Sequence, residues 1–161
     1  MQNAKDSFYM ALRTRLMAIN PARIVLIRGA VRPGILVEEA EASFSQIPAD
    51  VFILRWLGIG MDRELESPMM AADCEVVYQT RGTQAFGGLD RGRCLSSMDA
   101  ELLKMLTPPQ TLKVNYAANP PLEMSTQVFW DEPILGPAVM QRDQMSRSVK
   151  VKVYCLLEAG E

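Results

Sequence analysis

The sequence predicts one α+β domain over residues 1–161, in which two α-helices flank a mainly antiparallel β-sheet and long loops join the elements. Two segments repeat apolar residues at helical spacing, and Ser148–Cys155 alternates apolar and polar residues as a half-buried strand does. The expected helices and strands do not follow the regular strand–helix–strand order that a parallel sheet requires. A length of 161 residues also suits a single domain.

The first predicted helix lies at the N-terminus. Its apolar face has spacings of four, four and three residues: Phe8, Leu12, Leu16 and Ile19. Asp6 or Ser7 is expected to cap it, because a short side-chain oxygen accepts hydrogen bonds from the free N–H groups of the first turn. Asn20-Pro21 is expected to end it, since a residue that precedes proline is disfavoured in helical geometry.

The second predicted helix lies past the middle of the chain. Its apolar face is made of the following residues: Met98, Leu102, Met105 and Leu106. Ser96 or Ser97 is the expected cap. Pro108-Pro109 is expected to end the helix, because proline lacks the N–H group that a helix interior needs.

The strands predicted in the first half of the chain are apolar, β-branched or aromatic segments between turn formers. Arg23–Ile27 and Ile35–Glu39 are two short runs separated by glycine and proline. Asp50–Leu57 has the composition of a strand buried on both faces, and we expect the glycines that follow to end it. Cys74–Thr80 is the next predicted strand.

In the second half, Thr111–Tyr116 and Met124–Trp130 are predicted strands. The final strand, Ser148–Cys155, has the clearest pattern. The residues that we expect to face the core are Val149, Val151, Val153 and Cys155. Lys150 and Lys152 are expected to face water, as on the open side of an antiparallel sheet.

Three loop insertions are expected, at about residues 58–73, 81–95 and 131–147. The middle one contains Arg81–Arg93, a segment with four glycines and three arginines. Its spacing matches neither the phosphate-binding loop of the Walker type nor the dinucleotide fingerprint. Three interpretations remain open: an anion or nucleotide held by backbone N–H groups and guanidinium forks, a nucleic-acid contact, or a contact with another protein.

The composition narrows the function classes. Histidine is absent, which excludes histidine-dependent catalytic triads and zinc sites that use imidazole. The formal net charge of −2 gives little support to a broad nucleic-acid-binding surface. The three cysteines are far apart in sequence and form no C-x-x-C pair, so we expect buried free thiols.

Acidic residues cluster at Glu38-Glu39-Glu41, Glu64-Glu66 and Asp131-Glu132, and we interpret all three clusters as solvated surface. We therefore predict no catalytic, cofactor-binding or metal-ligating residues, no cofactor, and a protein that is not an enzyme. No signal peptide and no apolar run long enough to span a bilayer is evident, so we expect a soluble protein that stays where it is made, without a membrane partner.

The residues singled out for contact lie in or beside the loops and on the open face of the final strand. Loop methionines and aromatic residues favour assembly, because methionine adapts to irregular surfaces and aromatic residues and arginine are enriched at interfaces. The candidates for an oligomer or partner interface are Arg81, Phe86, Arg91, Arg93, Trp130, Lys150 and Lys152.

The order of these features resembles a known family. An N-terminal helix (Ser7–Ile19) is followed by an Arg-Pro-Gly-Ile-Leu-Val segment at Arg32–Val37, a compact helix (Ser97–Leu106), an aromatic segment at Gln127–Trp130 and an alternating final strand. This order is similar to that of the tail terminator and tail-completion proteins of long-tailed bacteriophages, including the lambda type.

The resemblance implies a structural virion protein of the tail or neck, assembled in the host bacterial cytoplasm. It would form a ring, a hexamer by the resemblance, that caps the tail tube, ends its polymerisation and joins it to the head–neck connector. Its implied partners are further copies of itself, the tail tube protein and the connector protein, and DNA would pass through the lumen without specific binding. The resemblance carries over no catalytic residues.

Two other hypotheses stay open. In the first, the chain is a nucleotide- or small-molecule-binding enzyme subunit that uses the glycine- and arginine-rich loop 81–93. In the second, it is a nucleic-acid-binding accessory protein whose contacts are the arginines of that loop. The two differ from the ring hypothesis in their expected oligomeric state.

Overall fold

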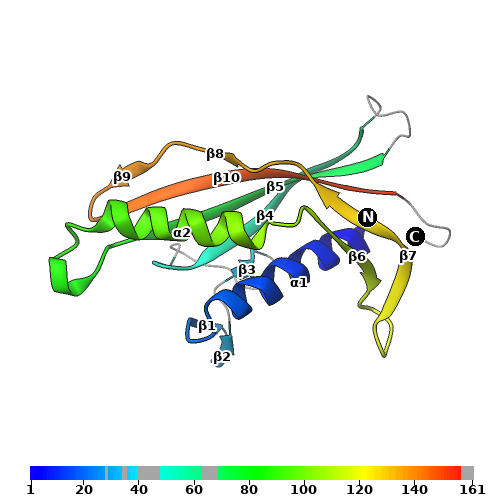
Figure 1. Cartoon of the computed structure of the whole chain (residues 1–161), viewed down its shortest axis with the longest axis horizontal. Coiled ribbons are helices and arrows are strands. Elements are labelled where there is room, and N and C mark those ends of the chain that lie inside the picture. Colours follow the sequence, from blue (N-terminus) through cyan, green and yellow to red (C-terminus); the bar gives the residue numbers. More distant parts are fainter. Residues whose placement is uncertain (28, 34–35, 40–47, 63–68, 157–161) are drawn as a thin grey trace.

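The computed structural model describes residues 1–27, 29–33, 36–39, 48–62 and 69–156. Two α-helices pack on one face of a large β-sheet, and a small hairpin lies apart from it (Figure 1). In the described chain the large sheet has eight strands, and all its pairs are antiparallel except β3–β4. The predicted α+β class with a mainly antiparallel sheet is confirmed.

The elements follow one another along the chain as follows: α1 (Gln2–Ile19), β1 (Ile24–Ile27), β2 (Ala30–Pro33), β3 (Leu36–Glu38), β4 (Phe52–Asp62), β5 (Met69–Thr80), the 3-10 helix η1 (Gln84–Phe86), α2 (Arg91–Met105), β6 (Gln110–Asn115), β7 (Leu122–Trp130), β8 (Ile134–Leu135), β9 (Val139–Gln141) and β10 (Gln144–Cys155). Neither helix in this described chain is long and apolar enough to cross a membrane.

The central strand of the large sheet is β10. The strand order is β3-β4-β5-β10-β7-β6. Along one side β10 pairs with β5 from Met145 to Cys155, and along its other side it pairs in succession with β9, β8 and β7. The strand predicted from the clearest sequence pattern is therefore the one that holds the sheet together.

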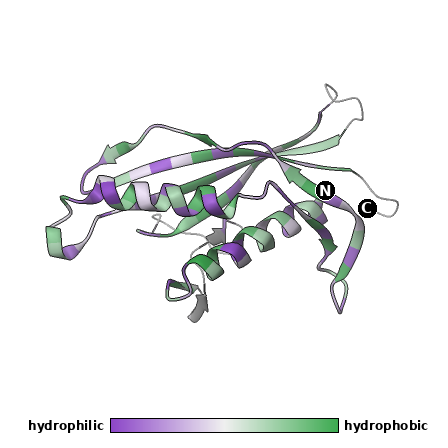
Figure 2. Cartoon of the chain, in the orientation of Figure 1, coloured by the Kyte–Doolittle hydropathy of each residue, from purple (hydrophilic) through white to green (hydrophobic). Residues whose placement is uncertain are grey.

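The core lies between the helices and the sheet. Val149, Val151, Val153 and Cys155 all face it, which confirms the predicted faces of the final strand. Phe8 of α1 packs edge-to-face against two tryptophans, with ring centroids 5.8 Å from Trp56 and 5.0 Å from Trp130. Figure 2 shows hydrophobic and hydrophilic residues interleaved along each helix, as expected when one helix face covers a sheet.

Both helices begin earlier than predicted. α1 starts at Gln2, and no side-chain cap hydrogen bond is formed. Ser7 instead donates to Asn3 O (2.6 Å) and accepts from Val114 N–H (2.8 Å), so its hydroxyl joins α1 to β6. α2 starts at Arg91, within the loop predicted to reach residue 95, because the chain already turns at Asp90.

The loop predicted at residues 58–73 is largely a β-hairpin. β4 continues to Asp62 and β5 starts at Met69, and the chain between them lies outside the described residues. Gly58 does not end the strand, because a register shift between Trp56 and Gly58 absorbs one extra residue and pairing resumes beyond it. The backbone hydrogen bonds of the ladder outweigh the weak strand preference of glycine here.

The connection predicted at residues 131–147 is also partly strand. It continues along β10 as β8 and β9, and β10 itself begins at Gln144. Pro133 and Pro137 divide this path into short pieces, because proline cannot donate a hydrogen bond to a neighbouring strand. Gly136 N–H still donates to Ser148 O (2.9 Å), which keeps the segment against the sheet.

The remaining strand predictions agree with the structure where it is described. β1 matches the run predicted at Arg23–Ile27, and it pairs with β2 across a turn in which Gly29 has φ +79°. Ile35 of the predicted Ile35–Glu39 strand lies outside the described residues, and so do Glu41 and the Glu64-Glu66 pair.

Candidate functional site

The glycine-rich loop is held in shape by its own contacts. Gly82, Gly87 and Gly88 have positive φ values of 74°, 55° and 79°. The Asp90 carboxylate accepts hydrogen bonds from Thr83 N–H (2.9 Å) and Thr83 Oγ1 (2.7 Å), and these bonds lower the pKa of Asp90. A Cβ atom added at Gly82 would lie 2.6 Å from Asp90 Oδ1. The close approach therefore requires glycine.

Two of the predicted loop arginines fasten this loop to the turn between β9 and β10. Arg91 Nε donates to Asp143 O at 2.8 Å, and Arg81 Nε lies 3.8 Å from the Asp143 carboxylate. A phosphate in this loop would meet the Asp90 carboxylate. This geometry does not favour anion binding. The contacts hold the loop so that its outer side faces solvent.

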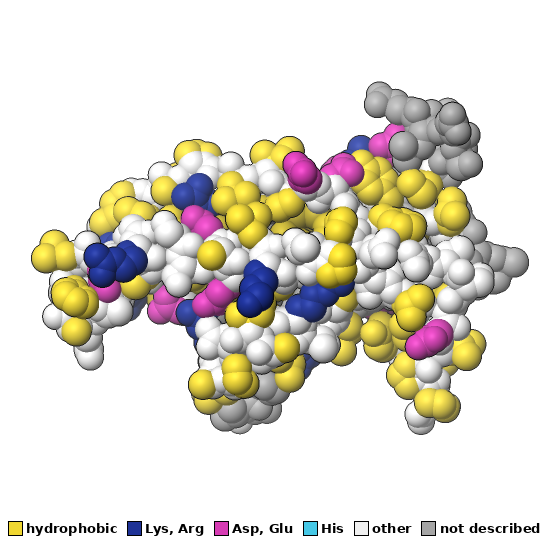
Figure 3. All heavy atoms as spheres, in the orientation of Figure 1, with side chains coloured by type: hydrophobic (Ala, Val, Ile, Leu, Met, Phe, Trp, Pro, Cys, Tyr) yellow, Lys and Arg dark blue, Asp and Glu magenta, His cyan; other side chains and the backbone are white. Residues whose placement is uncertain are grey.

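The outer side of the loop is apolar. Leu89 is 91% exposed and Phe86 is 59% exposed, and we call these two residues the loop tip. Arg93 follows in the first turn of α2 and makes no hydrogen bond or ion pair within the described residues. Figure 3 shows hydrophobic and basic side chains side by side at the end of the molecule where this loop lies. These two exposed apolar side chains make the loop a candidate contact site.

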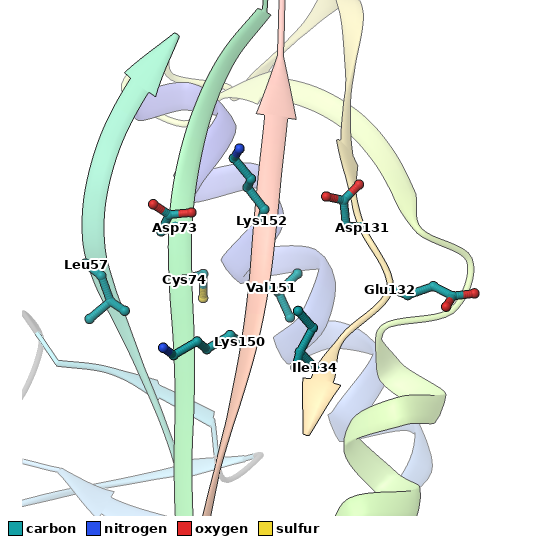
Figure 4. Close-up of a pocket in the computed structure, with 9 residues that line it drawn as sticks. All are labelled: Leu57, Asp73, Cys74, Asp131, Glu132, Ile134, Lys150, Val151 and Lys152. Atoms are coloured by element: carbon teal, nitrogen blue, oxygen red, sulfur yellow. The ribbon is translucent and has the colours of Figure 1, made fainter. Parts of the chain in front are cut away.

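A first hollow, of about 450 Å³, lies on the sheet face away from the helices (Figure 4). We call it the sheet hollow, and its lining is Leu57, Asp73, Cys74, Asp131, Glu132, Ile134, Lys150, Val151 and Lys152. Lys152 Nζ donates to Asp62 Oδ2 at 3.1 Å. This hydrogen bond, together with the charges of the neighbouring carboxylates, raises the pKa of Lys152. The side chain of Lys150 extends from β10 over β5 (Figure 4), and it forms no ion pair within the described chain.

Tyr154 interacts with the charged residues of this face. Its hydroxyl donates to Asp131 Oδ2 at 2.7 Å. Partial burial and then this hydrogen bond raise the pKa of Tyr154 well above its usual range. Lys152 Nζ lies 5.6 Å from the centre of the Tyr154 ring. Charges of both signs are thus largely matched on this face.

A second hollow, of about 620 Å³, lies where the C-terminal end of α2 meets the segment after β7. We call it the Trp130 hollow, and its lining is Leu103, Leu106, Thr107, Pro109, Trp130, Asp131, Glu132 and Pro133. Trp130 is only 4% exposed, and its Nε1 donates to Leu106 O at 2.8 Å, so this residue forms a fixed floor. The two acidic residues, Asp131 and Glu132, line both hollows.

The interface candidates predicted from sequence fall into two groups. Arg81, Phe86, Arg91 and Arg93 lie in or beside the loop at the start of α2, and Trp130, Lys150 and Lys152 line the two hollows. Their role in an interface stays a prediction. Sequence reasoning missed Leu89 and treated Asp131-Glu132 as plain surface. An apolar residue between glycine and aspartate in a turn-forming segment was the available signal for Leu89.

No model of a known protein family matches this chain, and no curated protein matches it. Within the described residues, no three acidic, cysteine or histidine side chains are grouped so that they could hold a metal ion. The arguments that follow rest on the surfaces themselves.

Proposed function

We propose that this protein is a structural component of a bacteriophage tail or neck, a tail terminator or tail-completion protein. Copies of the chain form a ring, a hexamer by the family resemblance, that caps the tail tube, ends its polymerisation and joins it to the head–neck connector. The protein works through contacts with these neighbours and not as an enzyme, and DNA crosses the ring without specific binding. The ring forms in the host cytoplasm and stays in the virion.

The observation that carries this proposal is the presence of two unlike contact surfaces on one chain. The loop tip is apolar and lies next to an unpaired arginine, whereas the hollows are partly apolar and edged by carboxylates. A ring is a head-to-tail assembly, so each copy must offer two different patches that fit each other. A chain with one self-complementary patch would instead favour a two-fold dimer.

Further apolar side chains are exposed at the edges of the sheet. Ile59 and Met61 lie on the part of β4 that reaches past β3, and Ile134 and Met140 lie on β8 and β9. These sets are on opposite sides of the strand order. Contacts with the tail tube and the connector need such additional surfaces, because the contacts between ring neighbours would occupy the loop tip and the hollows.

The enzyme alternative has less support, since the loop it would use is occupied by Asp90. Electron microscopy of the purified protein tests for the ring, and equilibrium dialysis with a nucleotide tests the enzyme alternative. We expect rings, and we expect tail tubes of the encoding phage to stop growing once the protein is added. A protein that stays monomeric with and without tubes, or that binds a nucleotide in equilibrium dialysis, would overturn the proposal.

A further inference from the structure

We propose that the loop tip of one copy inserts into the Trp130 hollow of the next copy, with Arg93 placed against Asp131 and Glu132. This inference rests on the proposed function, because it assigns the contact that would close the ring. It identifies the partner of both surfaces as a second copy of this chain.

The loop tip is ready to bind without further ordering. Leu89 and Phe86 stand out from a loop that Asp90, Thr83 and Arg91 hold together through the hydrogen bonds described above. A loop that is already held in shape loses little backbone conformational entropy on binding. Large apolar anchors at the centre of an interface contribute most of its affinity.

The Trp130 hollow has the complementary character. Its lining combines apolar side chains, among them Leu103, which is still 40% exposed, with charged side chains that are acidic only. Arg15 lies over the Trp130 ring at 5.3 Å, but its N–H groups donate to the carbonyl oxygens of Met105, Pro108 and Gln110. Those bonds hold its guanidinium in place, and Glu132 has no ion pair within the described residues.

The sheet hollow is the weaker receptor for the same tip. It is smaller, and it carries Lys150 and Lys152 in addition to the acids. These lysines would face Arg93 of the incoming copy, and like charges brought together at an interface oppose association.

The tip cannot reach the hollow of its own chain. The tip precedes the first residue of α2, whereas Leu103 and Leu106 lie at the far end of that helix (Figure 1). A helix rises about 1.5 Å per residue, so α2 holds the two surfaces roughly 20 Å apart. Contact between them must therefore join two copies, and repetition of that contact gives a head-to-tail series.

Charge exchange tests the pairing. In sedimentation experiments, Arg93→Glu and Glu132→Arg should each weaken self-association about 10-fold. The double variant should recover to within about 3-fold of the original, because it restores the attraction with reversed signs. Lys150→Glu is the matched control in the sheet hollow, and it should leave assembly unchanged. A double variant no better than either single one would overturn the pairing.

The apolar contact has its own test. Leu89→Asp should weaken assembly by about 30-fold or more, whereas Leu122→Asp, at a side chain that is 62% exposed on β7, should not. Circular dichroism checks that each variant is folded. Normal rings from Leu89→Asp would overturn this inference and leave the proposed function standing. An original protein that forms no ring, with or without tubes, overturns both.

Cross-linking gives a positive readout. On a Cys94→Ser background, Leu89→Cys combined with Leu103→Cys should yield a ladder of covalent oligomers with a short thiol cross-linker. Each single cysteine variant should yield none. A covalent dimer from Leu89→Cys alone would point to contact between two tips and would contradict insertion into the hollow.

Discussion

The two faces of the main sheet are made by the same strands but carry different kinds of side chain. On the face covered by the helices, β10 presents Val149, Val151 and Val153, which are buried in one continuous core. On the opposite face, the residues between them include Lys150 and Lys152, which line an open hollow. Burial of the covered face stabilises the fold, whereas the opposite face remains available for contact.

The covered face also contains a polar contact that is shielded from water. Tyr78 of β5 donates a short hydrogen bond to Asp99 of α2, and Arg147 of β10 lies 3.1 Å from the same carboxylate. These three residues are largely shielded from water, so their interactions fix how α2 sits on the sheet. Ion pairs on the open face, such as Lys152–Asp62, are more exposed and weaker for that reason.

The largest expected effect comes from the centre of the covered face. Phe8→Ala should lower the free energy of unfolding by about 3–5 kcal/mol, because it leaves a cavity between two tryptophan rings. Ile134→Ala, at a side chain that is 72% exposed on the open side, should change it by less than about 0.5 kcal/mol. Urea titration followed by tryptophan fluorescence measures both, and equal effects would contradict the division between the faces.

Thiol labelling tests the burial of the covered face without changing the core. Cys74 and Cys155 are buried on the covered side, whereas Cys94 on α2 is half-buried. Burial raises the pKa of the Cys74 thiol far above its usual range, which leaves almost no reactive thiolate. In the native protein Cys94 should react first, and the other two at least about 100-fold more slowly. Three equal rates would contradict the described burial.

The Tyr78 contact has a predictable pH dependence. Burial and then the bond to Asp99 raise the pKa of Tyr78 in the folded protein above the value of about 10 in an unfolded chain. Its contribution to stability is therefore complete below about pH 10 and is lost as the pH rises further. Tyr78→Phe should cost about 1 kcal/mol at neutral pH and should reduce the loss of stability in alkali.

Chemical denaturation of this variant and the original protein at neutral and alkaline pH measures the difference. An alkaline loss of the same size in both proteins would show that Tyr78 does not carry it.

The smallest effect is expected on the open face. Lys152→Met removes the charge that pairs with Asp62, but the lysine is 42% exposed and the pair contributes little. We expect no measurable shift of the urea midpoint, at low or at high salt. A loss as large as that of Tyr78→Phe would show that the open face also supports the fold.

The sequence allowed the helices and the faces of β10 to be predicted, but only part of the candidate site. Phe86, Arg93 and Trp130 were singled out from the sequence because aromatic residues and arginine are enriched at interfaces. The Trp130 hollow could not be predicted, since it joins Leu103 at the end of one helix to Glu132 after a strand, and no local pattern links them. The rigidity of the loop depends on Asp90 and Asp143, whose contacts also form only in the fold.

The sequence by itself determined which side of each helix and of β10 faces the core, because periodic burial is a local property of the chain. Only the tertiary structure decided that Gly58 lies within a strand and that residues 134–141 continue along β10. Those segments gain their hydrogen bonds from partners distant in the sequence, and such bonds can override local preference. The tertiary structure also placed the loop tip and the Trp130 hollow at opposite ends of α2, so the two surfaces cannot meet within one copy.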